Sequence, residues 1–409
     1  MDMVAGDPLH KHTHAHSHTR EALGGVAARD VARVLRLITI LCGILIVVGI
    51  AVLWPDRGDS AGGDPLQLAA EPLDAHVTDL SEQPCAGIPE QTCVVAVFEL
   101  RGGERVGTTG TFETSSDAPV SAGDEIQVTV IELEDGTTSY SFYDFQRRTP
   151  MLILLVAFAI AVVALGRWRG LGALAGLTVS LLIIVWFALP SLVDGNNAVA
   201  VALVTAGAIA IVALYLAHGV GPATDVALLS TFASLALTAV LASVFVGAAN
   251  LTGFTDDASF VLQALGTGID PRGILLAGVV IGSLGVLDDV TVTQVSAVWE
   301  LHRARPSASR PDLFKSALTI GRDHISSTVN TLFLAYAGAA LPLLLLFSSI
   351  NESVGAVMTR EIVATEIARA LVGSIGLVAS VPISTWLAVC VVTGPATTSK
   401  SSAPGEEDP

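Results

Sequence analysis

Long apolar blocks occupy most of the chain after residue 149, and one more lies near its start. Residues 37 to 54, LITILCGILIVVGIAVLW, are numerous enough to cross about 30 Å of hydrocarbon as a helix. Seven further blocks follow at about residues 150 to 166, 171 to 190, 198 to 217, 226 to 249, 273 to 290, 326 to 347 and 370 to 393. The pattern predicts an α-helical multi-pass membrane protein with about eight transmembrane helices.

Between the first and second blocks the pattern changes from continuous to alternating. Residues 55 to 75 are rich in Asp, Gly and Pro, which is typical of a linker. The segments 93 to 100, 125 to 131 and 137 to 145 then carry β-branched and aromatic residues in partly alternating order, with turn sequences between them. About five strands fit into this region, so we expect a small β-rich domain that is OB-like, an oligonucleotide/oligosaccharide-binding type of barrel.

Composition and charge refine this division. Apolar residues make up 52% of the chain and charged residues 14%, which excludes an ordinary soluble protein. Residues 55 to 148 hold 18 acidic and 5 basic residues, so −13 of the total charge of −17 lies there, and nucleic-acid binding is disfavoured. The predicted parts are a disordered His-rich tail (1–33), transmembrane helix 1 (34–54), an acidic extracytoplasmic domain (55–148), a seven-helix transmembrane domain (149–394) and a second disordered tail (395–409).

The basic residues predict the orientation, because positive charge is retained on the cytoplasmic side of a membrane. Arginines that fall in predicted inner segments are Arg29, Arg33, Arg36, Arg167, Arg169, Arg303, Arg305, Arg310 and Arg322. Both termini are therefore expected in the cytoplasm and the acidic domain outside. Residues 348 to 369 fall outside despite two arginines, and their helical rhythm is typical of an interfacial helix.

Two cysteines lie eight residues apart in the acidic domain. Cys85 and Cys93 flank a short stretch with Pro and Gly, so we expect a disulfide if the domain is extracytoplasmic; two free thiols are the alternative.

The strongest candidate site lies in the sixth predicted span, in the sequence GVVIGSLGVLDDVTVTQVS. Small and polar residues recur there every three or four positions, at Gly278, Gly282, Gly285, Asp289, Thr293 and Ser296. Such a stripe would admit a neighbouring helix and present the Asp289 carboxylate to it, so Asp289 is expected to be largely buried. The predicted ion or substrate pocket includes Asp288, Asp289, Thr291, Thr293 and Gln294; the alternative is that the span ends near Leu287 and both acids are solvated.

The seventh and eighth spans supply further polar residues at similar depth. Asn330 and Thr331 are expected to complete the pocket, with Ser384 from the eighth span, next to Pro382. Interhelical hydrogen bonds without any ligand are the alternative role for these side chains.

The remaining motifs carry little chemistry. The tail residues His10, His12, His14, His16 and His18 form a weak candidate for metal binding without fixed geometry; a passive hydrophilic tail is the alternative. The chain contains no H-E-x-x-H, G-x-S-x-G or Walker-type motif, so we expect neither an enzyme nor a cofactor.

Three segments resemble the YibE/F-like family of bacterial membrane proteins. They are GSLGVLDDVTVTQVS, GRDHISSTVNTLFLAYAGAALPLLLLF and EIARALVGSIGLVASVPIST, and the likeness extends over most of residues 35 to 394. The resemblance implies the bacterial cytoplasmic membrane and a loose expectation of transport, with no known substrate or functional residues.

The leading functional hypothesis is a membrane transporter or permease component of unknown substrate, with its pocket between spans 6, 7 and 8. The alternative is a cell-envelope scaffold or receptor whose outer domain binds a ligand or partner. The expected partners are the lipid bilayer and a small solute or ion; a homo-oligomer or an envelope protein is also compatible with the sequence.

Overall fold

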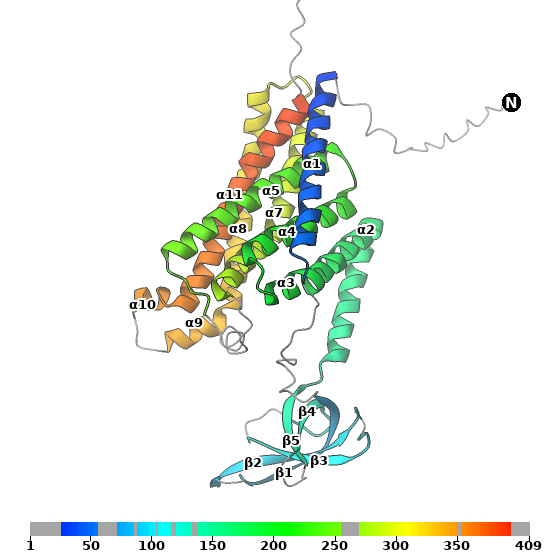
Figure 1. Ribbon diagram of the computed structural model, residues 1–409, viewed down its shortest axis with the longest axis vertical. Coiled ribbons are helices and arrows are strands. Elements are labelled where there is room, and N and C mark those ends of the chain that lie inside the picture. Colours follow the sequence, from blue (N-terminus) through cyan, green and yellow to red (C-terminus); the bar gives the residue numbers. More distant parts are fainter. Residues whose placement is uncertain are drawn as a thin grey trace, which may run out of the picture. The chain divides into compact units, whose positions relative to one another are not determined.

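A computed structural model describes residues 26–55, 72–85, 88–103, 105–115, 120–132, 138–254, 270–349 and 353–393. The chain divides into two compact units, one formed by Arg57–Leu171 and the other by the segments on either side of it. The first unit contains a small sheet and the second a helical bundle (Figure 1).

Five antiparallel strands form a single sheet in the order β3-β2-β1-β4-β5. They are β1 (Leu73–Cys85), β2 (Ile88–Leu100), β3 (Thr109–Ser115), β4 (Glu125–Glu132) and β5 (Thr138–Phe145). The long β1 pairs with β2 through most of its length and with β4 only through its first four residues. Its register against β2 shifts between Val77 and Asp79, as expected where a strand bends from one partner to another.

Alternation along the strands builds the core of this unit. Val77, Phe98 and Val128 are fully buried, and the rings of Phe98 and Tyr140 meet edge to face at 5.2 Å. The predicted strand segments 93 to 100 and 125 to 131 lie within β2 and β4. Cys85 and Cys93 are joined by a disulfide, with their Cα atoms 4.9 Å apart, which is the predicted pairing.

The first long helix of the chain after the sheet is interrupted. α2 (Arg148–Ile183) has non-helical backbone angles at Arg167, with φ 51° and ψ −128°. A Cβ added at Gly170 would collide with the carbonyl oxygen of Val162, so the chain turns sharply here and only glycine fits. The break falls between the predicted second and third spans. A π-helical turn (Ile184–Ala188) and α3 (Leu189–Val193) follow α2 directly.

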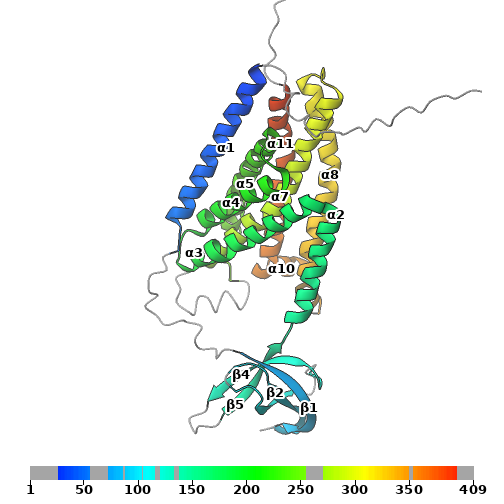
Figure 2. The same cartoon turned by 90° about the vertical axis from the view of Figure 1, so that its right-hand side faces the viewer.

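The second unit is a bundle in which three helices pack tightly against one another (Figures 1 and 2). These are α5 (Pro222–Ala248), α7 (Pro271–Ala304) and α11 (Glu361–Thr393). α4 (Ala198–His218) packs against α7 and α5, α8 (Arg310–Ala339) against α11 and α7, and α1 (Val26–Val52) against α4 and α5. The short helices are α9 (Leu341–Ser348) and α10 (Val354–Met358).

Small residues allow the close approach of the central helices. A Cβ at Gly376 of α11 would collide with the Thr238 hydroxyl of α5, and one at Gly373 would lie 3.3 Å from the Ser283 hydroxyl of α7. In a bundle that must pack within lipid, such contacts replace the hydrophobic driving force that acts in water.

Among the described residues, six helices are long and apolar enough to cross a membrane, or seven if the bent pair α8 and α9, at 63° to each other, is one span. The chain is thus a mostly helical membrane protein with a small antiparallel sheet domain. Several helices extend beyond their apolar blocks: α7 continues to Ala304, well past Leu287. α11 already begins at Glu361, so residues 361 to 369 are not a separate interfacial helix.

Candidate functional site

α7 carries the predicted site. A row of buried residues shows how this helix is oriented about its own axis. Leu287, Thr291 and Gln294 are almost completely buried, together with Val280, Leu284 and Val298 on the same face. These positions recur every three or four residues, which is the spacing of a packed helical face. This row determines which way every other side chain of α7 points.

Asp289 does not lie on the packed face. The structure leaves it exposed, together with the whole small-residue stripe at Gly278, Gly282, Gly285, Thr293 and Ser296, so the expectation of a buried Asp289 is wrong. The reason is geometric: residues two apart on a helix project about 200° apart, and Asp289 lies two positions from both Leu287 and Thr291. The larger apolar residues, and not the glycines, mark the tightly packed side.

Asp288 lies at the edge of the packed face, at the wall of a cavity of about 460 Å³. The cavity is formed by the second segment of α2, by the last part of α4 and by the middle of α7; its lining includes Ser180, Leu214, His218, Gly285, Asp288 and Asp289. It therefore lies where α7 faces α2 and α4, whereas the predicted pocket was placed between spans 6, 7 and 8.

One oxygen of Asp288 has no hydrogen-bond donor within the described part of the chain. Oδ1 is buried, and no described residue donates to it. A buried carboxylate oxygen without a donor is costly, by about 1–3 kcal/mol or more for a charged group, unless a proton, a water molecule or a cation binds it. The cavity and this acceptor together form a site that favours positively charged or proton-donating ligands.

The other predicted residues of α7 belong to a compact hydrogen-bond network. The Thr291 hydroxyl donates to the Asp288 carbonyl oxygen at 3.0 Å and lies 2.8 Å from the Thr231 hydroxyl of α5. The Gln294 side-chain amide donates to the Ala317 carbonyl oxygen of α8 at 2.9 Å and to the Thr385 hydroxyl of α11 at 2.7 Å. α7, α8 and α11 therefore meet in a packed polar contact.

Ser384 also lies in this packed region, whereas the two polar residues of α8 do not. Ser384 is fully buried and its hydroxyl donates to Val381 of its own helix at 3.2 Å. Asn330 and Thr331 are exposed, and the Thr331 hydroxyl donates to the Ser327 carbonyl oxygen one turn earlier at 3.0 Å. Their expected partnership with Asp289 is not formed, because α8 turns them away from α7.

Asp225 is a buried acid that was not identified from the sequence. Asp225 in the first turn of α5 is only 2% exposed; it accepts a hydrogen bond from the Tyr215 hydroxyl at 2.8 Å and lies 3.5 Å from the Arg36 Nε atom. It thereby joins α1, α4 and α5. Its signal was the Gly221-Pro222 pair, which is typical of a helix start and places Asp225 inside the helix and not in the preceding loop.

Metal binding finds little support in the described residues. The predicted tail ligands His10, His12, His14, His16 and His18 lie outside the described residues. Within them, the only close cluster of metal-binding side chains contains Cys85, Cys93 and Glu113. Its two sulfur atoms are already bonded to each other and cannot act as thiolate ligands.

Comparison with known proteins identifies the family. The sequence profile described as "YibE/F-like protein" matches residues 154–394, which is more than half of the chain and includes α4, α5, α7, α8 and α11. No curated protein and no solved structure matches this sequence. The matched region contains both the acid-lined cavity and the Gln294 network. Because the profile covers more than half of the chain, the chain belongs to the YibE/F-like family.

Proposed function

We propose that this protein is a transporter of a small cation, protons included, and that the cavity between α2, α4 and α7 binds the transported ion. The observation that supports this most directly is the buried Oδ1 of Asp288, a residue of the cavity wall, which accepts no hydrogen bond from the described part of the chain. Ionisable groups inside membrane helices are costly and generally serve ion or proton pathways. Asp289 adds a second carboxylate at the same cavity and raises its affinity for cations.

The proposed topology has eight spans, two more than the six described helices that are long and apolar enough to cross a membrane. The sharp turn at Arg167 and Gly170 supports a division of α2 into two spans. The bent pair α8 and α9 supplies a further one. An even number of spans returns the chain to its starting side, and eight spans are more than an anchor for one small domain requires.

The proposed location is a bacterial cytoplasmic membrane with both termini inside and the sheet unit outside. The distribution of arginines supports this orientation. The disulfide between Cys85 and Cys93 also supports it, because disulfides persist in oxidising compartments. The strand order, with β1 shared between β2 and β4, supports an OB-like barrel for the outer unit.

The orientation predicts how an engineered cysteine reacts. Val106 is 62% exposed on the sheet unit, and Cys42 and Cys390 are the free cysteines to be removed first. Val106→Cys should react with a membrane-impermeant maleimide in intact cells, and a cysteine at exposed Ser307, in the turn between α7 and α8, should react only after permeabilisation. The reverse labelling pattern would refute the proposed orientation.

Transport itself is tested on the purified protein in liposomes fused to a solid-supported membrane. Concentration jumps of H⁺, Na⁺, K⁺, Mg²⁺ and Mn²⁺ should produce a charge displacement for at least one ion, compared with protein-free liposomes. If protein shown to be folded gives no charge displacement with any of the five ions, that result would contradict a cation transporter. That result would favour the envelope scaffold or receptor.

A further inference from the structure

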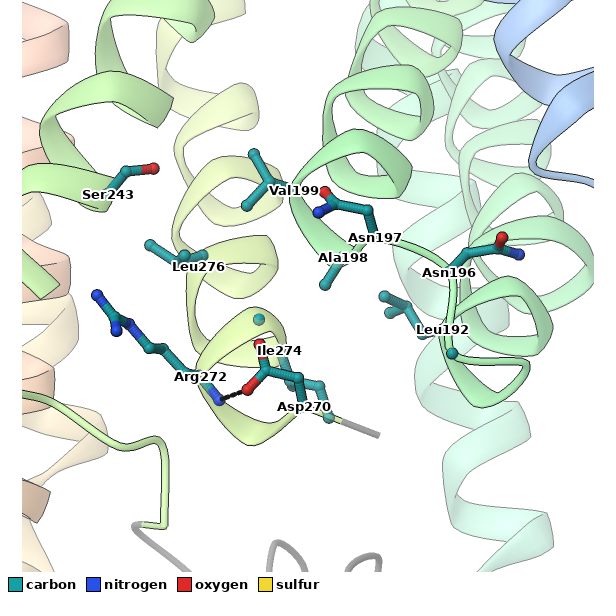
Figure 3. Close-up of a pocket in the computed structure, with 12 residues that line it drawn as sticks. Leu192, Asn196, Asn197, Ala198, Val199, Ser243, Asp270, Arg272, Ile274 and Leu276 are labelled. Carbon is teal, nitrogen blue, oxygen red and sulfur yellow. Dashed lines mark hydrogen bonds between the residues drawn. The ribbon is translucent and has the colours of Figure 1, made fainter. Parts of the chain in front are cut away.

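A second cavity lies at the end of the bundle where α4 and α7 begin, away from the acid-lined cavity. Its volume is about 520 Å³, within the range typical of sites for small solutes. Residues from the end of α3, the starts of α4 and α7 and the last part of α5 line it, and Asn197, Val199, Ser243, Asp270, Arg272 and Leu276 are among them (Figure 3). Whereas the first cavity is acidic, this one contains a guanidinium group.

Arg272 is the residue that distinguishes this cavity. Its backbone N–H donates to Oδ1 of Asp270 at 3.1 Å, but its guanidinium group forms no ion pair with a carboxylate of the described residues. Figure 3 shows the side chain extending from α7 toward Ser243, away from the Asp270 carboxylate. Arginine is uncommon at the outer ends of spans, where Arg272 is placed by the proposed topology, and its exposed side chain is open to a ligand.

Two other arginines at the same end of the bundle show the usual arrangement. Glu361, at the start of α11, accepts hydrogen bonds from the loop after α5, which places these helix ends together. Arg369 on α11 binds Glu366 at 2.8 Å, and Arg360 lies over the Phe347 ring at 5.1 Å. Arg272 differs from both because it lines a cavity and forms no ion pair or ring contact with the described residues.

The remaining groups around the cavity are compatible with a negatively charged ligand. Asp270 caps the first turn of α7, where its Oδ1 accepts the backbone N–H of Arg272. Asn197 uses its side-chain oxygen to cap α4 at the Ala200 N–H, which leaves its amide NH₂ free to donate. The first N–H groups of α4, at Ala198 and Val199, have no acceptor within their own helix.

We propose that this cavity binds a small oxyanion, a carboxylate or a phosphate, and that Arg272 is its charged ligand. The planar guanidinium group matches two oxygens of such an anion in parallel hydrogen bonds, and the Asn197 amide adds a donor. The anion is either a free solute or the headgroup of an anionic lipid, since both present the same oxygens. Binding at this cavity does not depend on cation transport through the other one.

The test uses the full-length protein in phosphatidylcholine nanodiscs and two probes. Calorimetric titration with inorganic phosphate and with succinate measures free anions, and native mass spectrometry after addition of phosphatidylglycerol measures retained lipid. Arg272→Gln should weaken either the binding of free anions or the retention of lipid by roughly tenfold or more, and Arg272→Lys should weaken the same quantity less. Both variants should keep the thermal midpoint of the wild-type protein. Arg303→Gln is the matched control, because Arg303 lies at the other end of α7 in an ion pair with Glu300 at 2.7 Å.

The outcomes separate the two sources of the anion. Loss of phosphate or succinate binding in Arg272→Gln identifies a free solute, and loss of lipid retention alone identifies a headgroup. If neither probe distinguishes Arg272→Gln from Arg303→Gln, the proposal is overturned. Cation currents measured in parallel are expected to persist in Arg272→Gln, so this proposal and the transport proposal can fail separately.

Discussion

Asp288→Asn is expected to reduce the cation-dependent charge displacement by roughly tenfold or more, while the protein remains folded. The amide has nearly the same shape but cannot carry the negative charge, and a tenfold loss corresponds to about 1.4 kcal/mol of lost interaction. Asp289→Asn should have a smaller effect, because Asp289 is exposed and its charge is better solvated.

An exposed acid on a neighbouring helix provides the control for this series. Asp323 on α8 does not line the cavity, and Asp323→Asn should leave the current unchanged. If Asp288→Asn keeps full activity, or if Asp289→Asn is the more severe change, the assignment of Asp288 as the principal ion ligand is wrong. Current amplitudes normalised to the amount of inserted protein give the answer directly.

Gln294→Ala is expected to lower the stability of the bundle by about 3 kcal/mol. The substitution removes two buried hydrogen bonds, to Ala317 and Thr385, and leaves a cavity where α7, α8 and α11 meet. Gln294→Met fills most of that volume without the hydrogen bonds and should cost about 1 kcal/mol, since interhelical hydrogen bonds in membranes are individually modest.

The two Gln294 variants are compared by thermal unfolding in detergent followed through tryptophan fluorescence. Gly321 lies against both Gln294 and Val381, so the site has little freedom to rearrange around a smaller side chain. Equal midpoints for Gln294→Ala and wild type would show that the three helices do not depend on this contact.

Sequence patterns predicted the classes of structure better than the directions of individual side chains. Continuous apolar runs located the helices of the bundle, and alternation located β2, β4 and β5, because these patterns follow from burial alone. The end of α7 and the start of α11 were missed, since both helices extend beyond their apolar blocks into polar sequence. Where a helix continues into polar sequence, capping residues and tertiary contacts determine where it ends, and the hydropathy of the sequence does not show these.

The segment of α7 singled out from the sequence lines the acid-lined cavity, but the face of the helix expected to be packed is the exposed one. Glycine stripes and apolar rows both recur every three to four residues, so the sequence alone does not indicate which of the two faces of α7 packs against the neighbouring helices. Leu287, Thr291 and Gln294 resolve this in the structure, and they leave Asp288 at the cavity and Asp289 exposed. Asn330 and Thr331 were misassigned for the same reason, because depth along a helix does not determine direction.

The most direct test of a water-filled ion path is the chemical accessibility of the cavity wall on α4. Ala213 and Ala217 line the cavity, whereas Ala206 on the same helix is fully buried in the core. In a background without Cys42 and Cys390, Ala213→Cys and Ala217→Cys should react with a small water-soluble methanethiosulfonate, and the reaction should block the cation current. Ala206→Cys should stay unreactive. Unreactive cysteines at 213 and 217, or full current after both have reacted, would contradict an ion path between α2, α4 and α7.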